Sequence, residues 1–323
     1  MRQGAMMRSP SDLPPELRSG AFAVGAHGAE GVTRRRARAA DLAVPFRGVR
    51  VPQPPSRERS SAYERASNPS GQPTRGQIAL ARAFAPLLEP DQAFSHLTAA
   101  HLHGMRTPER RPSSMVHVTT FGGRRPIRRV GVCAHRGAAD CPRTVRHGLP
   151  VLDPVETWLH LAGSLALDEL IVMGDGLARS GTSGTTVSGL GAALDTHRRL
   201  VGAPRLREAL GWIRTGSDSA RETMLRLLLV RAGLPEPDEL GGEIRNEYGV
   251  VIAHGDLVWR RARVIVEYEG DQHRTDRRQF AIDIDRIGEI QSLGWTVIRV
   301  DAALFARPAV LVSRIRAALG YSP

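Results

Sequence analysis

The sequence predicts a mixed α/β (α+β) chain of several domains, and three observations support this. Its 323 residues are more than a single hydrophobic core commonly organises. Short β-branched runs alternate with longer stretches whose apolar residues recur at helical spacing. A segment rich in proline and serine, 53–75, is typical of a loop between patterned regions. The expected parts are a disordered tail 1–14, a front domain 15–55, a linker 56–75, a middle domain 76–205 and a C-terminal domain 206–323.

The charge is distributed unevenly along the chain. There are 45 basic residues, all of them arginine, against 33 acidic residues, which gives +12. Residues 1–150 hold 24 arginines and 10 acids (+14), whereas residues 151–323 hold 21 arginines and 23 acids (−2). Codon usage also produces arginine, but the basic front half still favours a polyanion such as DNA as partner.

Several function classes are disfavoured by the composition. A transmembrane helix needs about 18 consecutive apolar residues, and the sequence has no such run. The first residues carry arginines without the apolar core of a signal peptide. Cys133 and Cys141 are too few for a disulfide framework or a thiolate zinc site. We therefore expect a cytoplasmic protein with no membrane partner.

The front segment 16–52 predicts two short helices and a basic wing. Thr33 is a candidate N-cap for a helix, and Phe46–Pro52 is expected to be extended. A helix followed by a basic wing is how winged-helix modules contact DNA. The alternative is an arginine-rich, solvated helix on a small α+β lobe. The DNA-contacting candidates are Arg34, Arg35, Arg36, Arg38, Arg47 and Arg50.

In the middle segment, helices and strands alternate. Ser95 and Gly104 are a plausible cap and stop for a helix, and Asp153-Pro154 is a clear helix start. The glycine-rich stretch Gly181–Gly191 lacks a lysine and phosphate-loop spacing, so we expect a connector. The expected elements are helices over 78–88, 94–104, 155–161, 167–177 and 198–214, and strands over 115–121 and 130–133.

Three histidines in the middle segment invite a metal proposal. His96, His101 and His103 fall on one expected helix, but their spacing places them on different faces. No acidic residue is nearby. The pattern therefore does not favour a metal site there.

The C-terminal segment predicts the order helix, three strands, helix, strand, helix. Ser219 opens the first helix, and Gly294 ends the second. The expected elements are helix 219–231, strands 243–246, 250–259 and 263–269, helix 274–293, a fully buried strand 295–300 and helix 308–319.

Acidic residues converge in this order of elements. Asp256 and Glu267 fall on adjacent antiparallel strands near the same end of the sheet, and Ile265, Glu267 and Glu269 share one face. Mg²⁺ binds through one or two carboxylates, water and substrate phosphate. Glu222 could reach the same ion, although Ser219 and Glu222 also fit a capping box. The alternative is that these acids are simply solvated where the strand surfaces.

The segment from about Ser217 to Leu319 resembles the very-short-patch-repair-like (Vsr-like) endonuclease domains of the PD-(D/E)XK nuclease superfamily. The likeness rests on Ser219-Ala-Arg-Glu222, Gly255-Asp256-Leu257, the run Val266–His273, Asp283-Ile-Asp-Arg286 and Gly294-Trp295-Thr-Val-Ile-Arg299. It implies a restriction-endonuclease-like αβββαβ domain and a phosphodiesterase dependent on Mg²⁺ or Mn²⁺. Asp256 and Glu267 match the acidic pair, and Glu222 matches the acid of the first helix.

One position departs from that superfamily. Its usual lysine would fall at Glu269, and this chain contains no lysine. Glu269 could ligand a second metal ion or orient water, and His273 is a candidate general base. Arg286 could hold a substrate phosphate or form a surface pair with Asp283.

The front two thirds resemble the type IV abortive-infection (AbiEi-like) antitoxin family more faintly. The likeness rests on Gly31-Val-Thr-Arg-Arg-Arg36, Pro45-Phe-Arg-Gly-Val49, Phe94-Ser-His-Leu-Thr-Ala-Ala100, Leu149-Pro-Val-Leu-Asp-Pro154 and Thr157-Trp158. It implies a winged helix, DNA binding and a regulatory role, with a second copy of the chain, a cognate toxin or a defence-system component as further partners.

Together these features predict a metal-dependent DNA endonuclease targeted by its basic front. The alternative is an antitoxin-like transcriptional regulator whose nuclease fold has lost turnover. RNA as the substrate is a third option that the sequence leaves open.

Overall fold

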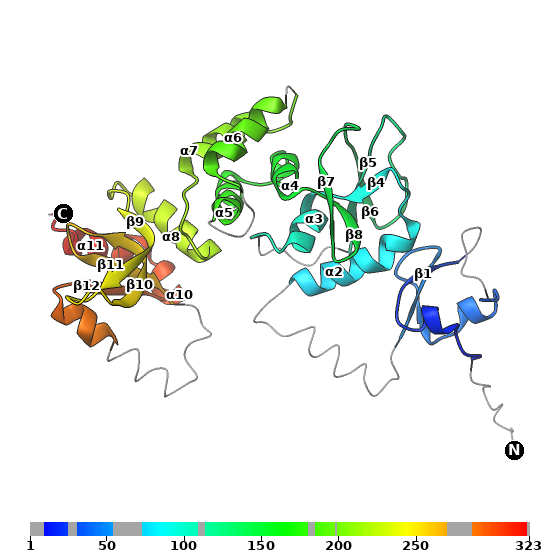
Figure 1. Cartoon of the computed structure of the whole chain (residues 1–323), viewed down its shortest axis with the longest axis horizontal. Coiled ribbons are helices and arrows are strands. Elements are labelled where there is room, and N and C mark those ends of the chain that lie inside the picture. Colours follow the sequence, from blue (N-terminus) through cyan, green and yellow to red (C-terminus); the bar gives the residue numbers. More distant parts are fainter. Residues whose placement is uncertain are drawn as a thin grey trace, which may run out of the picture. The chain divides into compact units, whose positions relative to one another are not determined.

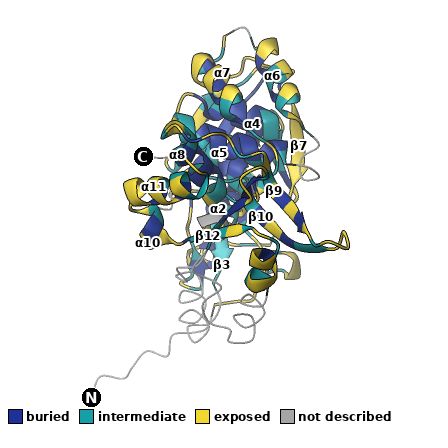
Figure 2. Cartoon of the chain, turned by 90° about the vertical axis from the view of Figure 1, so that its left-hand side faces the viewer, coloured by how far each residue is buried: buried dark blue, intermediate teal, exposed yellow. Residues whose placement is uncertain are grey.

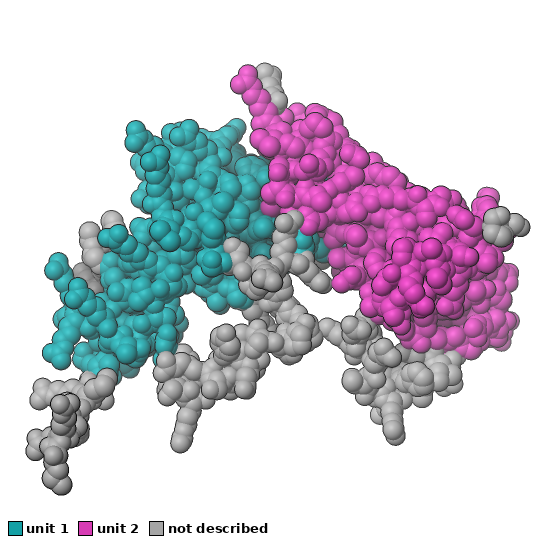
Figure 3. Space-filling model, turned by 180° about the vertical axis from the view of Figure 1, so that it is seen from behind, with its two compact units in different colours: residues 1–160 teal, residues 161–323 magenta. Residues whose placement is uncertain are grey.

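A computed structural model describes residues 10–24, 31–53, 73–108, 114–179, 185–197, 199–269 and 286–321. The chain forms two compact units, Met1–His160 and Leu161–Pro323 (Figure 3). Helices and three sheets confirm the expected mixed α/β class. The expected tail up to residue 9 and nearly all of the expected linker lie outside the described residues.

The first unit begins with a small sheet in the order β1-β3-β2. Its strands are β1 (Phe22–Ala23), β2 (Leu42–Ala43) and β3 (Val49–Pro52), accompanied by the 3₁₀ helices η1 (Pro15–Leu17) and η2 (Arg36–Arg38). Thr33 Oγ1 accepts a hydrogen bond from the Arg36 N–H at 3.2 Å, as a cap would, but only a 3₁₀ turn follows it. The expected wing is instead the central strand β3. The described part of this segment therefore contains no α-helix.

A larger sheet follows in the order β6-β5-β4-β8-β7. Ser95 and Gly104 flank the helix α3 as expected, with Gly104 in the left-handed conformation. Asp153 also starts a helix as expected, because its Oδ1 accepts the Val155 N–H at 2.8 Å. The elements are α2 (Pro73–Phe84), η3 (Ala85–Leu87), β4 (Gln92–Phe94), α3 (His96–His103), β5 (Val116–Thr120), β6 (Val132–Arg136), β7 (Arg143–Arg146), β8 (Leu149–Leu152) and α4 (Pro154–Leu161) (Figure 1).

The two sheets of this unit share one hydrophobic core. Phe46 and Val49 of the front segment are buried against Phe84 of α2 and Phe94 of β4. The rings of Phe46 and Phe84 meet edge to face, with 5.0 Å between their centroids. The front segment is therefore packed onto the larger sheet.

The second unit begins with helices α5 (Leu167–Ala178), α6 (Val187–Thr196) and α7 (Ala203–Trp212). Eight of the twelve α5 residues are buried, which Figure 2 shows in dark blue. The prediction that Gly181–Gly191 is a connector is wrong from Val187 onward, where α6 begins. Thr186 Oγ1 caps this helix by accepting the Gly189 N–H. That cap stabilises a helix despite two glycines within it.

The C-terminal sheet has the order β12-β11-β10-β9. It contains the antiparallel hairpin β9 (Glu239–Arg245) and β10 (Val251–Trp259), then β11 (Val264–Tyr268), then the parallel strand β12 (Thr296–Val300). The helices are α8 (Ala220–Arg231), a helix whose described part covers 286–292, α10 (Ala302–Phe305) and α11 (Pro308–Ala318). This confirms the expected order of elements and adds α10.

Helices cover both faces of this sheet. Val264 and Val266 of β11 pack in one cluster with residues of α8 and α11. Ile265, between them, packs in a second cluster with Ile290 of the helix over 286–292. Because side chains alternate along a strand, Glu267 belongs to the same face as Ile265. The expectation of a fully buried β12 is wrong, because β12 is an edge strand whose Thr296 is exposed.

Membrane-spanning helices were searched for across the described residues. None is long and apolar enough to cross a bilayer.

Candidate functional site

The hairpin and β11 bring Asp256 and Glu267 to one end of the sheet. Leu257 pairs with Val266, so Asp256 and Glu267 are cross-strand neighbours. The Tyr268 N–H donates a hydrogen bond to Asp256 Oδ2 at 2.6 Å. The predicted acidic pair is therefore fixed by the backbone register of β10 and β11.

Glu222 lies in the first turn of α8, near Asp256. Ser219 Oγ accepts the Glu222 N–H at 3.1 Å, and Glu222 Oε2 accepts the Asp218 N–H at 2.6 Å. These two bonds cap the helix end, although Glu222 accepts from the residue before the N-cap and not from Ser219 itself, as a capping box would require. The Glu222 carboxylate therefore already has a capping role, and it contributes negative charge beside Asp256 as well.

The Asp256 carboxyl is half-buried among like charges. Burial is the main cause that raises its pKa, and the nearby Glu222, Glu267 and Asp218 carboxylates raise it further, to about 7. The hydrogen bond from Tyr268 acts in the opposite direction. A cation bound here would relieve this repulsion, and carboxylate oxygens are the ligands that Mg²⁺ prefers.

The three carboxylates are close without forming a complete cage. In the described parts of the chain, their oxygens are not among the groups of three or more whose donor atoms all lie within 4.8 Å of one another. The three carboxylates therefore do not form a preformed three-ligand site, and an ion here would be held by one or two of them and water, which is how Mg²⁺ is commonly bound.

Arginines accompany the acids of β11. Arg286 belongs to the helix that covers this face of the sheet, and its Nη2 lies 3.5 Å from Glu267 Oε2. Glu269 forms an ion pair with Arg299 of β12. The position expected for a lysine therefore carries a carboxylate whose charge is offset by a neighbouring guanidinium.

Two of the predicted residues, His273 and Asp283, lie outside the described residues. Their expected roles as a general base and as an Arg286 partner remain predictions.

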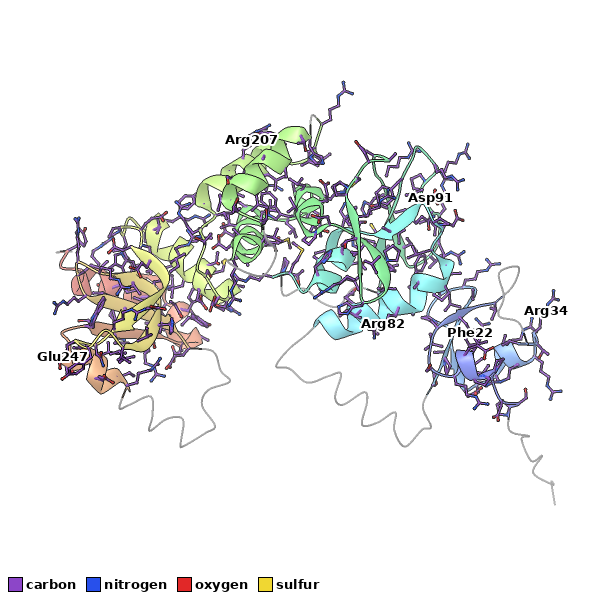
Figure 4. All side chains as sticks on the ribbon, viewed as in Figure 1. Phe22, Arg34, Arg82, Asp91, Arg207 and Glu247 are labelled. Carbon is purple, nitrogen blue, oxygen red and sulfur yellow. The ribbon has the colours of Figure 1, made fainter. Side chains whose placement is uncertain are left out.

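The front arginines divide into two groups. Arg34, Arg35, Arg38 and Arg47 are exposed, and Figure 4 shows Arg34 pointing outward. Arg36 is only 7% exposed and donates to both carboxylate oxygens of Asp41 at 2.9 and 2.7 Å. Arg50 donates to the carbonyl oxygens of Ala37 and Val49. The expectation that Arg36 contacts DNA is corrected, because its guanidinium holds the fold of the front segment.

One cavity of the second unit lies elsewhere. It measures about 860 Å³, and none of the predicted acids lines it. Its walls include the ion pairs Arg214–Glu236 and Arg260–Glu239. Its charged groups are therefore largely paired with each other.

A histidine cluster in the first unit was not expected from the sequence. Nitrogens of His96, His117 and His135 lie within 4.8 Å of one another. The sequence pattern groups His96 with His101 and His103 instead. The rings of His101 and His103 are hydrogen-bonded to the backbone carbonyls of Leu97 and Leu152. The signal in the sequence is that His117 and His135 each fall on a strand. Only the pairing of β5 with β6 shows that their side chains meet.

Comparisons with known proteins give one weak relationship. The chain is 28% identical over 204 residues to uncharacterized protein Rv2248 of Mycobacterium tuberculosis strain H37Rv, covering 63% of this chain and 72% of that protein. Uncharacterized protein MT2308 of strain CDC 1551 matches with the same identity and coverage. No family model and no solved structure matches the chain.

Proposed function

We propose that this chain is a divalent-metal-dependent endonuclease that hydrolyses DNA phosphodiester bonds. The observation that carries the proposal is the half-buried Asp256 carboxyl, which lies among Glu222 and Glu267 at one end of the C-terminal sheet. Without a cation, this arrangement has a clear energetic cost, because like charges are desolvated together. In a nuclease, the cluster would bind Mg²⁺ or Mn²⁺ beside the phosphodiester.

The order of elements supports the same proposal. In the described residues from α8 to α11, a helix, three strands, a helix, a strand and two helices follow one another. This is the order expected of a restriction-endonuclease-like core, with its acidic pair on the second and third strands.

Asp256 and Glu267 would hold the ion, and Glu222 would support them. When bound, Mg²⁺ supplies a water molecule of lowered pKa and positive charge beside the scissile phosphate. Arg286, 3.5 Å from Glu267, would pair with a phosphate oxygen of the substrate. The Tyr268 N–H orients the Asp256 carboxylate so that one oxygen remains for the ion.

The basic front would add affinity for the nucleic acid backbone. Four exposed arginines, Arg34, Arg35, Arg38 and Arg47, can contact phosphates without reading sequence. The described part of this segment contains no α-helix, so the proposed contact is made by exposed arginines beside a three-stranded sheet and not by a winged helix.

One observation favours a second candidate function. The Glu269–Arg299 pair leaves no lysine-like cation at the position that the superfamily uses to stabilise the attacking water. An antitoxin-like transcriptional regulator, with a nuclease fold that binds DNA but does not cleave it, accommodates this pair.

A cleavage assay separates these functions. Supercoiled plasmid, single-stranded DNA and RNA are incubated with the full chain in Mg²⁺, Mn²⁺ or EDTA, beside Glu267→Ala. The endonuclease proposal expects metal-dependent products from DNA and a loss of at least about 100-fold in Glu267→Ala. Products from RNA alone would replace DNA as the substrate. DNA binding without any metal-dependent product would support the regulator instead.

A further inference from the structure

Three histidines from three elements of the first unit converge on one point. His96 is the first residue of α3, His117 lies on β5 and His135 on β6. Their nitrogens lie within 4.8 Å of one another, and His117 Nδ1 is 3.1 Å from His135 Nε2. Two imidazole ligands of one tetrahedral Zn²⁺, each about 2.0–2.1 Å from the ion, lie at a comparable separation of roughly 3.3 Å.

The rings lie close together, but His96 and His135 are stacked face to face, so binding one tetrahedral ion would require the His96 ring to turn until both rings point at the ion. The His96 and His135 ring centroids are 3.6 Å apart, and those of His117 and His135 are 5.3 Å apart. Burial is the main cause that lowers the pKa of His96 to about 2 and of His117 to about 4, and neighbouring histidines lower both further.

The backbone conformation and nearby hydroxyl groups constrain these residues. His96 has a φ of 48°, in the left-handed region that residues other than glycine rarely adopt. Ser95 Oγ lies 3.0 Å from His96 Nδ1, and Thr98 Oγ1 accepts the His117 N–H at 2.9 Å. A strained backbone is characteristic of functional sites, and outer contacts commonly position the ligands of a metal.

A second group of ligand-type residues adjoins the first. Donor atoms of Cys141, Glu156 and His160 also lie within 4.8 Å of one another, and the His160 ring meets the His96 ring with 5.6 Å between centroids. Glu156 Oε2 lies 3.7 Å from His160 Nε2, which is an ion-pair distance and longer than a hydrogen bond. Burial and Glu156 raise the pKa of the Cys141 thiol to about 12, so this cysteine is not a ready thiolate ligand.

Imidazole ligands select transition metals over Mg²⁺ and Ca²⁺. A site with three of them is typical of Zn²⁺ that retains a further coordination position. We propose that His96, His117 and His135 bind one Zn²⁺ ion, which links the start of α3 to β5 and β6 in the first unit. This site is independent of the acidic cluster and of the proposed nuclease activity.

The test measures Zn²⁺ itself with the full chain, free of any histidine tag. Protein stripped with EDTA is titrated with Zn²⁺ in the presence of a competing chromophoric chelator, and Co²⁺ replaces Zn²⁺ for absorption spectra. The expected result is one tightly bound ion per chain, with the visible absorption bands of a nitrogen-rich tetrahedral Co²⁺ site and an increase in the melting temperature.

Three variants are compared in the same titration. His117→Gln and His135→Gln keep polar side chains of similar size, and exposed His254→Ala of the second unit is the matched control. Both ligand variants should lose at least about 100-fold in Zn²⁺ affinity, since even outer-shell changes cost 10–100-fold. His254→Ala should bind as the unchanged protein does.

Folding of each variant is checked by circular dichroism and thermal unfolding in EDTA, where metal plays no part. A folded His135→Gln that binds Zn²⁺ as tightly as the unchanged chain would overturn the proposal. So would the absence of any bound Zn²⁺ or Co²⁺ in the unchanged, folded protein. If His117→Gln does not fold, the titration of His135→Gln alone decides the result.

Discussion

Asp256 is the residue at which burial and charge conflict most strongly in the acidic cluster. Its pKa is raised to about 7, mainly by burial and then by Glu222 and Glu267. The folded state therefore binds the proton more tightly than the unfolded state, whose carboxyl has a pKa near 3.9. As the pH rises from about 4 through 7, Asp256 ionises in the folded protein at a cost, and its contribution lowers the free energy of unfolding.

Replacing Asp256 with asparagine should remove this cost. Asparagine is uncharged and its amide oxygen can still accept the Tyr268 N–H. In EDTA at pH 8, Asp256→Asn should unfold with a free energy higher by roughly 1–3 kcal/mol, and the difference should vanish near pH 4. Urea denaturation at the two pH values measures it. A variant less stable than the unchanged chain at pH 8 would contradict the account.

The sequence indicated some functional and buried residues better than others. Asp256 and Glu267 could be predicted because strand alternation and hairpin order place them together. The burial of Arg36 could not, because Asp41 follows it by five residues in a segment with no regular pattern. The convergence of His117 with His135 depended on the pairing of β5 with β6, which no local pattern specifies.

At the scale of elements, a buried ion pair joins α5 to α8 within the second unit. Asp175 and Arg226 are 0% and 1% exposed, with 3.0 Å between Oδ2 and Nη2. Thr223 Oγ1 and the Arg214 N–H also donate to Asp175. Removing one partner of such a pair leaves an uncompensated buried charge.

Asp175→Ala should therefore destabilise the second unit by about 3–5 kcal/mol. Guanidinium denaturation followed by tryptophan fluorescence measures the change. Trp212 is close to the ion pair, because its carbonyl oxygen accepts a hydrogen bond from Arg226. The matched control is Asp168→Ala, which breaks the half-exposed pair with Arg231 and should cost no more than about 1 kcal/mol. Equal losses in both variants would show that burial does not set the strength of the Asp175 pair.

The elements themselves were largely predictable where caps and periodicity agreed. Ser219, Asp153 and Gly104 mark helix ends in the sequence and in the structure. α6 was missed because its glycines suggested a loop, although Thr186 caps it. β12 was expected to be fully buried because of its apolar run, but the order of strands, which places it at the edge, is a tertiary property.

At the scale of the whole molecule, the front segment folds against the larger sheet of its unit. Phe46 is 4% exposed and contacts Phe84 of α2. Phe46→Ala should cost about 3–4 kcal/mol and expose the front segment to proteolysis. Val44→Ala, at a side chain that is 58% exposed, is the control and should change the digestion rate little. An unchanged digestion rate in Phe46→Ala would mean that the front segment does not depend on this core.

The basic front should make DNA binding sensitive to salt. If Arg34, Arg35 and Arg38 contact phosphates, replacing all three with glutamine should reduce the slope of log affinity against log salt by about 3. Fluorescence anisotropy with a labelled duplex at several salt concentrations measures the slope. The same triple replacement should leave the melting temperature unchanged, because all three side chains are exposed. An unaltered slope would move the DNA contact elsewhere.

The central claim is that the carboxylates at the end of β10 and β11 bind a divalent cation. Calorimetric titration of the full chain with Mg²⁺ at pH 8 tests it most directly, beside Asp256→Asn, Glu267→Gln and Glu247→Gln. Glu247 is an exposed acid in the turn between β9 and β10, labelled in Figure 4, and serves as the control. The account predicts one Mg²⁺ site that is lost in Asp256→Asn and Glu267→Gln and kept in Glu247→Gln. Equal Mg²⁺ binding by all four proteins, or none by the unchanged chain, would contradict it.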